Sequence, residues 1–487
     1  MKHQLLCIPA LACATASTLH VPSAYPGIQD AIDASSDGDT VLVAPGIYQE
    51  NIRFLGKAVV LISESGYALT TIDGSDPADP DSGSVVSFID GEGPGSELTG
   101  FTVTGGTGTQ SGTNRRGRGV FCLGSSPTIR ENLVTGNSIF SVDNSYGAGV
   151  LCSTSDASVE GNVISSNSAG SQNGHGYGGG ICFVLGSSPD ISHNHVLGNQ
   201  ATYGGGIYGK HESYAVITNN AVYWNSAFGG GGLCCNAGIT PEVCNNSFCY
   251  NEASAEGGGV WSTESDVVLM NDIIWGNGAP SGTQIWAGDG SAVDLEYCDV
   301  QYGEDSVYCH PGASMTWGAG IIDAAPGFAP GPLSPFQLSG SESPCADAGN
   351  PSTAYCDPED PANPGSALWP ALGTVINDMG AYGGGGAGYW VGMPPGQVAP
   401  PLQPCMAVSP NPLRGTGSVL YSVPSPGPVT LEVYDVSGRL VGTLVDGFSP
   451  AGDKTAALDC SDLSAGVLLI RLECGKAAAV GRVVILR

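Results

Sequence analysis

A template that repeats with a step of about 26 residues in its later copies constrains this chain more than any other feature. Each copy has a Gly run, an apolar residue, a short polar stretch, and then the pattern apolar-x-x-Asn-x-apolar-x-x-Asn. A unit this short cannot bury its apolar face alone, so successive copies must stack on one another. The closing asparagines of the copies are Asn137, Asn167, Asn199, Asn225, Asn251 and Asn277.

Stacked copies predict parallel sheets that run along a solenoid axis. Each copy contains short β-branched strands, broken by Gly and Asn where the chain must turn. Neighbouring coils would lie about 4.8 Å apart, and Asn at one corner of each coil would form a ladder of side-chain amides. Each amide bond adds about 1 kcal/mol, whereas each buried Val, Ile or Leu adds roughly 1.5–3 kcal/mol. The apolar stack therefore dominates the predicted stability.

The N-terminal segment adds a family resemblance. Residues 25–32 and 37–50, together with the template, resemble the right-handed parallel β-helix proteins, the superfamily of pectate lyases and polygalacturonases. The resemblance covers residues 17–330 and implies an all-β solenoid. It also implies a short helix that caps the apolar core, with residues 40–43 as the first strand. It is specific for fold and weak for function, because one fold hosts many activities.

Composition changes after the last repeat. Residues 331–393 are rich in Pro and Gly and resemble a closing module found after many bacterial β-helices, which we expect to cap the far end of the solenoid. Cys345 and Cys356 are near enough in sequence to close a small disulfide loop. Residues 394–404 contain five Pro and predict a stiff linker.

Residues 405–487 predict a small Ig-like β-sandwich, because short alternating apolar runs are separated by Gly, Pro and Ser turns. This segment resembles the C-terminal sorting domain of the type IX secretion system. The resemblance implies export to the cell surface of a Gram-negative-type bacterium, with the secretion machinery as a partner. An ordinary Ig-like accessory domain is the alternative. The matching segments are residues 409–412, 433–441, 463–467 and 482–487.

The first residues predict an export signal. Lys2 and His3 precede an apolar run, and small residues at 14–16 suit a cleavage site, so we expect a signal peptide over 1–16. An exported chain would place its cysteines in a compartment where disulfides persist. No apolar stretch reaches about 18 residues, and no membrane-spanning helix is expected.

The charge balance restricts partners. The chain has 45 acidic and 15 basic residues, a net charge of −30, which argues against nucleic acid and anionic membranes. A polyanionic substrate would be repelled unless a cation such as Ca²⁺ bridged it. One acidic loop offers hard oxygen ligands for Ca²⁺, with a plain acidic surface loop as the alternative; its carboxylates are Asp73, Asp76, Asp79 and Asp81.

Aromatic residues predict a ligand-binding stripe. If the first apolar residue after each Gly run points inward, the next one points outward, which places Phe121, Tyr208 and Trp261 in one outward column. Trp224 and Tyr250 occupy a second column, just before the closing Asn of neighbouring coils. Such a stripe suits stacking on sugar rings. The alternatives are that a loop covers these residues or that they belong to the core.

An enzyme on this scaffold would need an acid and a base on one exposed face. Basic side chains are scarce between residues 100 and 330, and Lys210, His211 and Glu212 form the densest titratable cluster. The sequence thus predicts a secreted or cell-surface β-helix that binds polysaccharide or another surface ligand. The alternative is a polysaccharide lyase or a glycoside hydrolase that uses this cluster.

Overall fold

The computed structural model describes residues 16–329 and 336–392, and residues 406–485 apart from positions 410–412, 424–426, 450–451, 461–462, 464 and 475–476. The signal peptide, except for residue 16, and the whole 394–404 linker lie outside the described residues. No helix within the described ranges is long and apolar enough to cross a membrane.

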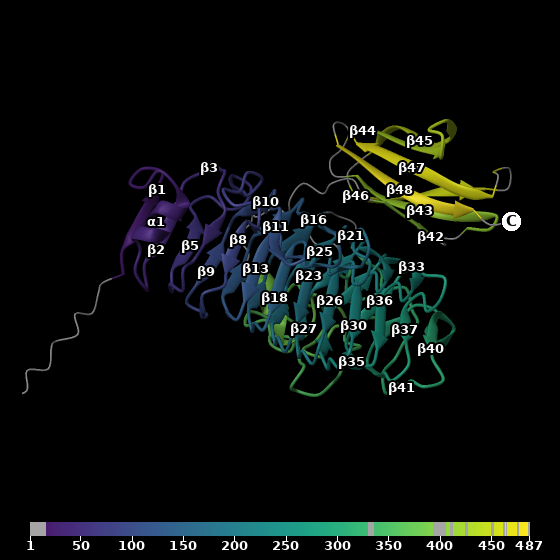
Figure 1. Cartoon of the computed structure of the whole chain (residues 1–487). Helices are drawn as coiled ribbons and strands as arrows, with labels where there is room; N and C mark the ends of the chain where they lie inside the picture. Colours follow the sequence, from purple (N-terminus) through teal and green to yellow (C-terminus); the bar gives the residue numbers. More distant parts are fainter. Residues whose placement is uncertain are drawn as a thin grey trace, which may run out of the picture.

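Three long parallel sheets run along the solenoid axis (Figure 1). The first sheet contains β1 (Thr18–Val21), β2 (Thr40–Val43), β5 (Val60–Ser63), β9 (Glu97–Thr99), β14 (Thr128–Arg130), β19 (Ser158–Glu160), β24 (Asp190–Ser192), β27 (Val216–Thr218), β31 (Glu242–Cys244), β35 (Asp266–Met270), β38 (Ala292–Glu296) and β41 (Ser314–Trp317). The second contains β3 (Gly46–Tyr48), β6 (Thr70–Asp73), β10 (Thr102–Thr104), β15 (Leu133–Thr135), β20 (Val163–Ser165), β25 (His195–Leu197), β28 (Ala221–Tyr223), β32 (Ser247–Cys249), β36 (Ile273–Trp275) and β39 (Asp299–Val300). The third contains β4 (Ile52–Arg53), β8 (Val86–Phe88), β13 (Val120–Leu123), β18 (Val150–Ser153), β23 (Ile181–Val184), β26 (Ile207–Lys210), β30 (Leu233–Asn236), β34 (Val260–Thr263), β37 (Ile285–Ala287) and β40 (Val307–Cys309).

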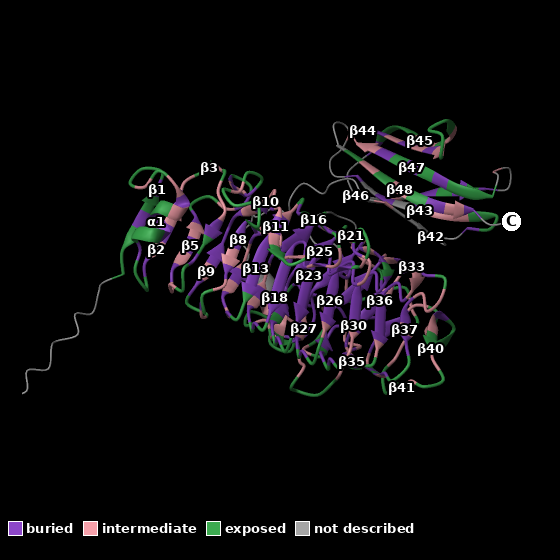
Figure 2. Ribbon diagram, viewed as in Figure 1, coloured by how far each residue is buried: buried purple, intermediate pink, exposed green. Residues whose placement is uncertain are grey.

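Shorter strands cover the outer side of the third sheet. They are β7 (Ser82–Gly83), β11 (Gly108–Ser111), β12 (Asn114–Arg116), β16 (Ser138–Ser141), β17 (Ser145–Tyr146), β21 (Ser168–Ser171), β22 (Gly176–Tyr177), β29 (Ser226–Gly229) and β33 (Glu252–Glu256). Each coil contributes inward side chains from all three long sheets, such as Ile217, Val222 and Leu233, which have no exposed surface. The apolar stack expected from the template is the core of the solenoid (Figure 2).

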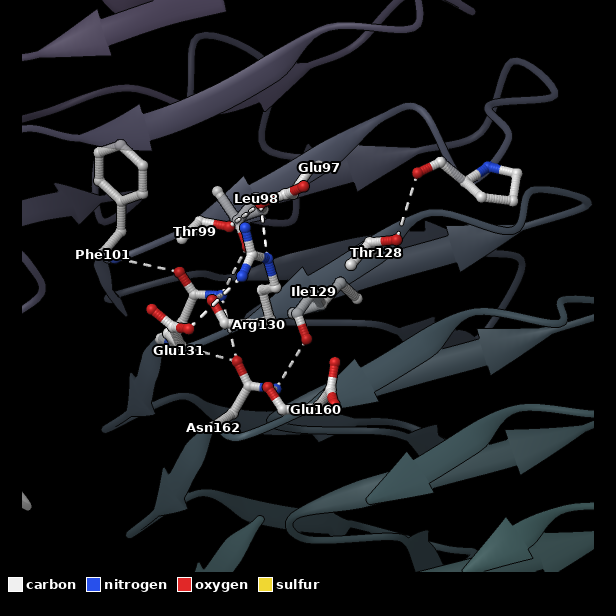
Figure 3. A network of polar contacts seen from close by, with 12 residues as sticks. Glu97, Leu98, Thr99, Phe101, Thr128, Ile129, Arg130, Glu131, Glu160 and Asn162 are labelled. Atoms are coloured by element: carbon white, nitrogen blue, oxygen red, sulfur yellow. Dashed lines mark hydrogen bonds and ion pairs between the residues drawn. The ribbon is translucent and has the colours of Figure 1, made fainter. Parts of the chain in front are cut away.

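Asparagine ladders join the coils, as the template predicts. The Oδ1 atom of Asn220 accepts the backbone N–H and the Nδ2 of Asn194 at 2.9 and 3.0 Å. Its own Nδ2 donates to the Ile191 carbonyl at 2.7 Å. Figure 3 shows an early part of the same ladder, where Asn162 Nδ2 donates to the Ile129 carbonyl at 2.8 Å. The closing asparagines form a second ladder with the same geometry.

A helix caps the N-terminal end of the core, as the resemblance implies. Helix α1 (Ile28–Ala34) buries Ile28 and Ile32 in the solenoid core. The Glu50 carboxylate accepts the backbone N–H groups of residues 28 and 29, both at 2.8 Å, where a helix leaves its donors without partners. One expectation is corrected: β2 is the second strand, because β1 pairs with it in parallel.

The module after the repeats lies along the flank of the solenoid and not across its far end. It includes the 3-10 helix η2 (Gly385–Gly392), and another short helix, η1 (Gly303–Ser306), lies before β40. Several of its hydrogen bonds go to one corner column in which Asn219, Asn245 and Asn271 have φ values of 56°, 54° and 57°. Asn tolerates this left-handed conformation. The side-chain amides are therefore free to bond the module.

The expected disulfide between Cys345 and Cys356 is wrong. All thirteen cysteines in the described part of the chain have free thiols. The Cys345 thiol donates to the Asp299 carboxylate at 3.1 Å, in a buried seam between the module and β39. Cys356 contacts the Ser352 carbonyl at 3.8 Å.

The C-terminal segment is a separate β-sandwich. A three-stranded antiparallel sheet contains β42 (Met406–Ser409), β43 (Thr416–Val423) and β46 (Gly452–Asp459). The facing four-stranded sheet contains β45 (Leu440–Ser449), β44 (Gly427–Asp435), β47 (Gly466–Cys474) and β48 (Ala477–Ile485). Alternate residues of β44, such as Leu431 and Val433, point into a core of their own.

Candidate functional site

The predicted outward column on the third sheet is buried. Val120 and its counterparts do point inward, and Phe121, Tyr208 and Trp261 lie in a different apolar cluster on the other side of the sheet. Their exposed fractions are 3%, 0% and 8%. A polysaccharide cannot stack on side chains that solvent does not reach, so the prediction of an exposed stripe is wrong for these three residues.

The Gly runs explain this burial. In successive coils a Gly with positive φ folds back over the outward side chain four residues later. A Cβ added at these positions would lie 2.5 to 2.7 Å from the Cβ of the covered aromatic residue, which is closer than real contacts allow. The covering pairs are Gly117 with Phe121, Gly204 with Tyr208, and Gly257 with Trp261.

Covered aromatic rings also stack along the axis. The rings of Trp261 and Trp286 are 5.3 Å apart and nearly parallel, and those of Trp286 and Tyr308 are 5.7 Å apart. Tyr203 contacts Trp261 from the other side, with 5.8 Å between ring centroids. This column packs the third sheet against its outer strands, which is a structural role.

Trp224 and Tyr250 lie elsewhere, at a corner next to β28 and β32. Each has a φ of 54°, a left-handed conformation, and each is half-buried. Neighbouring coils place Gly198 and Gly276 at the same corner, with φ values of 60° and 71°. A left-handed conformation costs a residue with a side chain about 1–2 kcal/mol relative to its usual one. Large rings thus occupy two positions where neighbouring coils have glycine, and Ser166 shows that this corner is left-handed in other coils as well, with a φ of 55°.

Both rings line one cavity, which we call the aromatic pocket. Its volume is about 350 Å³. Phe336 contributes another ring to its lining, and the centroid of this ring is 5.8 Å from that of Tyr250, 6.5 Å from that of Trp224 and 5.1 Å from that of Phe328. Among the described residues, no charged side chain lines it. The lining residues are Trp224, Tyr250, Trp275, Ala325, Pro326, Gly327, Phe328, Ala329, Phe336 and Tyr421.

Sequence reasoning found two of the five rings that the solenoid and the module contribute to this pocket. Trp275 ends β36 one residue before Gly276, so inspection of the column next to Trp224 and Tyr250 would have found it. Phe328 and Phe336 follow the last repeat, where no periodic pattern assigns them a direction. Only the folded chain brings them to the corner.

The structure does not bring the proposed catalytic cluster together. Lys210 Nζ lies over the Tyr177 ring, 5.5 Å from its centre. His211 and Glu212 form the turn after β26, with φ values of 63° and 52°. Partial burial and the Lys210 charge lower the pKa of His211. Among the contacts of the described residues, no ion pair or hydrogen bond joins Lys210 to Glu212.

In the acidic loop, two of the four carboxylates accept hydrogen bonds from the loop's own backbone. The Asp73 carboxylate accepts the Ser75 N–H at 3.0 Å, and the Asp79 carboxylate accepts the Asp81 N–H at 3.0 Å. Asp76 lies between them on the exposed loop, and its carboxylate belongs to no group of three or more acidic, His or Cys side chains among the described residues. The ranges described above contain no group of three or more His, Cys, Asp or Glu side chains placed to hold a metal ion. Calcium binding at this loop stays a prediction without support from the geometry.

One ladder position carries a carboxyl group in place of an amide. Asp272 follows Asn246 in the first ladder and accepts its backbone N–H at 2.6 Å and its Nδ2 at 3.0 Å. It has no exposed surface, and burial raises its pKa to about 7. An asparagine there would be neutral at every pH, so this rung introduces a pH dependence that the asparagine rungs lack.

Comparison with known proteins gives two family matches. The model of the family described as "Periplasmic copper-binding protein (NosD)" matches residues 32–288. The model described as "Secretion system C-terminal sorting domain" matches residues 407–486, which include the whole of the described sandwich except its first residue. No curated protein and no solved structure matches the chain.

The described residues do not fit the copper that the first description names. Copper sites are built from imidazole, thiolate and thioether groups that converge on one point. His193 and His195 lie close in sequence and are buried, but His193 Nε2 is 3.0 Å from the Gly386 carbonyl, and no group of three or more His, Cys, Asp or Glu side chains converges among the described residues. Cys122 and Cys152 face each other on neighbouring coils inside the sealed core, where burial raises the pKa of Cys122. No step of the proposed function involves copper.

The two matches account for both parts of the chain. The sandwich is a type IX C-terminal sorting domain, which makes this a secreted or cell-surface protein. The first match covers 257 of 487 residues (32 through 288), more than half of the chain, and it lies within the coils of the right-handed β-helix, whose strands run from β1 to β41. The chain therefore belongs to the NosD family.

Proposed function

We propose that this protein is a surface-displayed β-helix that binds polysaccharide in the aromatic pocket. The observation that carries the proposal is the placement of Trp224 and Tyr250 in left-handed corner positions, with both rings on one cavity. Glycine would avoid the backbone cost at both corners. Retention of large rings at that cost is expected where the rings serve a ligand.

Sugar chemistry suits such a pocket. Aromatic rings bury large apolar surfaces and hold few rotatable bonds, so they offer a flat face to the apolar side of a pyranose at low entropic cost. Trp224 and Tyr250 are half-buried, so part of each side chain remains accessible to a ligand. A Cβ at Gly276 would lie 2.4 Å from the Tyr250 ring, so this ring lies over the neighbouring coil.

The scaffold supports a binding role. Successive coils are locked by the ladders and the apolar core, which fixes the corner residues relative to one another. The sorting domain has its own core and engages the secretion machinery. It also places Tyr421 of β43 at the edge of the aromatic pocket, whose other lining residues come from the solenoid and the module.

The lyase or hydrolase alternative stays a prediction. Lys210 is directed toward Tyr177, while Glu212 lies on the turn beside Gly238, where a Cβ added to that glycine would be 3.7 Å from the Glu212 Cγ. An acid/base pair for glycoside hydrolysis needs two carboxyl groups roughly 5–10 Å apart across the scissile bond. No observation favours such a pair among the described residues of this turn.

Affinity gel electrophoresis with a panel of polysaccharides tests the proposal. The mature chain should be retarded by at least one polysaccharide, and a Trp224→Ala/Tyr250→Ala variant should migrate freely in the same gel. Phe228→Ala is the matched control, because this ring is 49% exposed on β29 and lies outside the pocket. Equal retardation of all three proteins would refute the pocket. Reducing-end and unsaturated-uronate assays on the same mixtures would reveal hydrolase or lyase activity.

A further inference from the structure

The lining of the aromatic pocket favours cations over anions. None of its described lining residues has a charged side chain, and five of them present Trp, Tyr or Phe rings from the solenoid and the module. The face of an aromatic ring carries negative partial charge. The whole chain has a net charge of −30, which favours the approach of cations over anions to the protein.

These features should make the affinity of the pocket highest for cationic ligands and lowest for anionic ones. A cation over aromatic rings is attracted by the ring faces, most strongly where water is excluded. The chain already contains one such contact, with Lys210 Nζ 5.5 Å from the centre of the Tyr177 ring. A carboxylate in the same place would meet repulsion from the rings and from the chain, with no Lys or Arg in the described part of the lining to compensate it.

We propose that the aromatic pocket selects glycans with free, protonated amino groups over neutral glycans, and neutral glycans over uronates. This inference rests on the proposed function and specifies its ligand class. A protonated amino sugar offers both features that the pocket recognises, an apolar ring face to stack and a cation to lie against the remaining rings. Trp224 and Tyr250 supply stacking surfaces, and Phe336 adds a third ring within 6.5 Å of both.

Three tetrasaccharides of equal length test the ranking by isothermal titration of the mature chain: β-1,4-linked glucosamine, its fully N-acetylated form, and tetragalacturonate. The glucosamine tetramer should bind about tenfold more tightly than the acetylated one. The uronate should not bind measurably. Tetramethylammonium should compete with the glucosamine tetramer, because it presents a cation without a sugar ring.

A highly acidic protein attracts any cationic oligomer weakly, so the control must leave the charge unchanged. Trp224→Gly/Tyr250→Gly retains the net charge of −30 and adopts residues that neighbouring coils already use at this corner. Binding that survives in this variant is nonspecific, and only the difference from the parent chain reports on the pocket. Thermal melting of the variant verifies that the solenoid remains folded.

The outcomes separate the two proposals. Tighter pocket-dependent binding of the glucosamine tetramer supports both. Pocket-dependent binding of the acetylated tetramer or of the uronate with equal or higher affinity would overturn the charge selectivity and leave the glycan site in place. Identical titrations of the parent chain and the double variant with all three tetrasaccharides would overturn both.

Discussion

Replacement of Trp224 by glycine tests whether this ring serves ligand binding or the stability of the fold. The residue has a φ of 54° at a corner where Gly198 and Gly276 serve neighbouring coils. Glycine should relieve about 1–2 kcal/mol of left-handed strain. The change removes a half-buried ring, and about half of the roughly 200 Å² that a Trp buries, at 25 cal/mol per Å², is worth about 2.5 kcal/mol.

These two effects nearly offset each other. The greater freedom of glycine in the unfolded chain costs a further 0.5–1 kcal/mol or so, and the expected net loss in the free energy of unfolding is about 1–2 kcal/mol. Trp261→Ala provides the contrast, because this ring is 8% exposed and stacked on Trp286. Its truncation should cost about 3–5 kcal/mol.

Urea unfolding gives the stabilities, and affinity gel electrophoresis gives the binding. Trp224→Gly should lose polysaccharide retention and keep most of its stability, whereas Trp261→Ala should lose stability. A loss of about 3–5 kcal/mol for Trp224→Gly, with retention unchanged, would refute the reasoning and make the Trp224 ring part of the packing.

Three further predictions concern the scaffold and export. Burial raises the folded-state pKa of Asp272 to about 7 from 3.8, so its contribution to stability is complete below pH 4 and is lost as the pH rises through 7. Urea unfolding at pH 5 and pH 8 checks this: between the two pH values, the free energy of unfolding of Asp272→Asn should rise by roughly 2–4 kcal/mol relative to that of the parent chain. Asn220→Leu breaks a buried ladder and should cost about 1–3 kcal/mol in the same assay, against less than about 0.5 kcal/mol for Asn236→Leu, which lies at the end of β30 and outside both ladders. Equal losses for these two variants would mean that the ladder adds no stability. Deletion of residues 405–487 should leave a folded solenoid in the periplasm, and cell fractionation that finds the truncated chain on the surface would contradict the role of the sorting domain.

The solenoid was predictable because successive coils repeat the same sequence pattern. An inward Val or Ile, a corner Asn and a Gly run recur at fixed offsets, and each has a single place in a stacked coil. Strand β1 lacks the template, so no repeated pattern indicates that a strand precedes β2. The flanking position of the module was equally hidden, because it depends on amides such as Asn245 that bond residues more than a hundred positions later.

The candidate site was predictable only in part, for a physical reason. Alternation along a strand tells which side of the sheet Tyr208 lies on, but not what covers that side. The cover is the backbone of the Gly run, and the positive φ of Gly204 shows its path only in the folded chain. Trp224 and Tyr250 were recognised from their shared column, whereas Phe336 reaches the pocket from outside the repeats.

A crystal structure of the mature chain with a retained oligosaccharide would show directly where the glycan binds. We expect a sugar ring stacked on Trp224 or Tyr250, inside the cavity that Phe336 also lines. An ordered oligosaccharide bound at any other surface, with the aromatic pocket empty, would contradict this expectation.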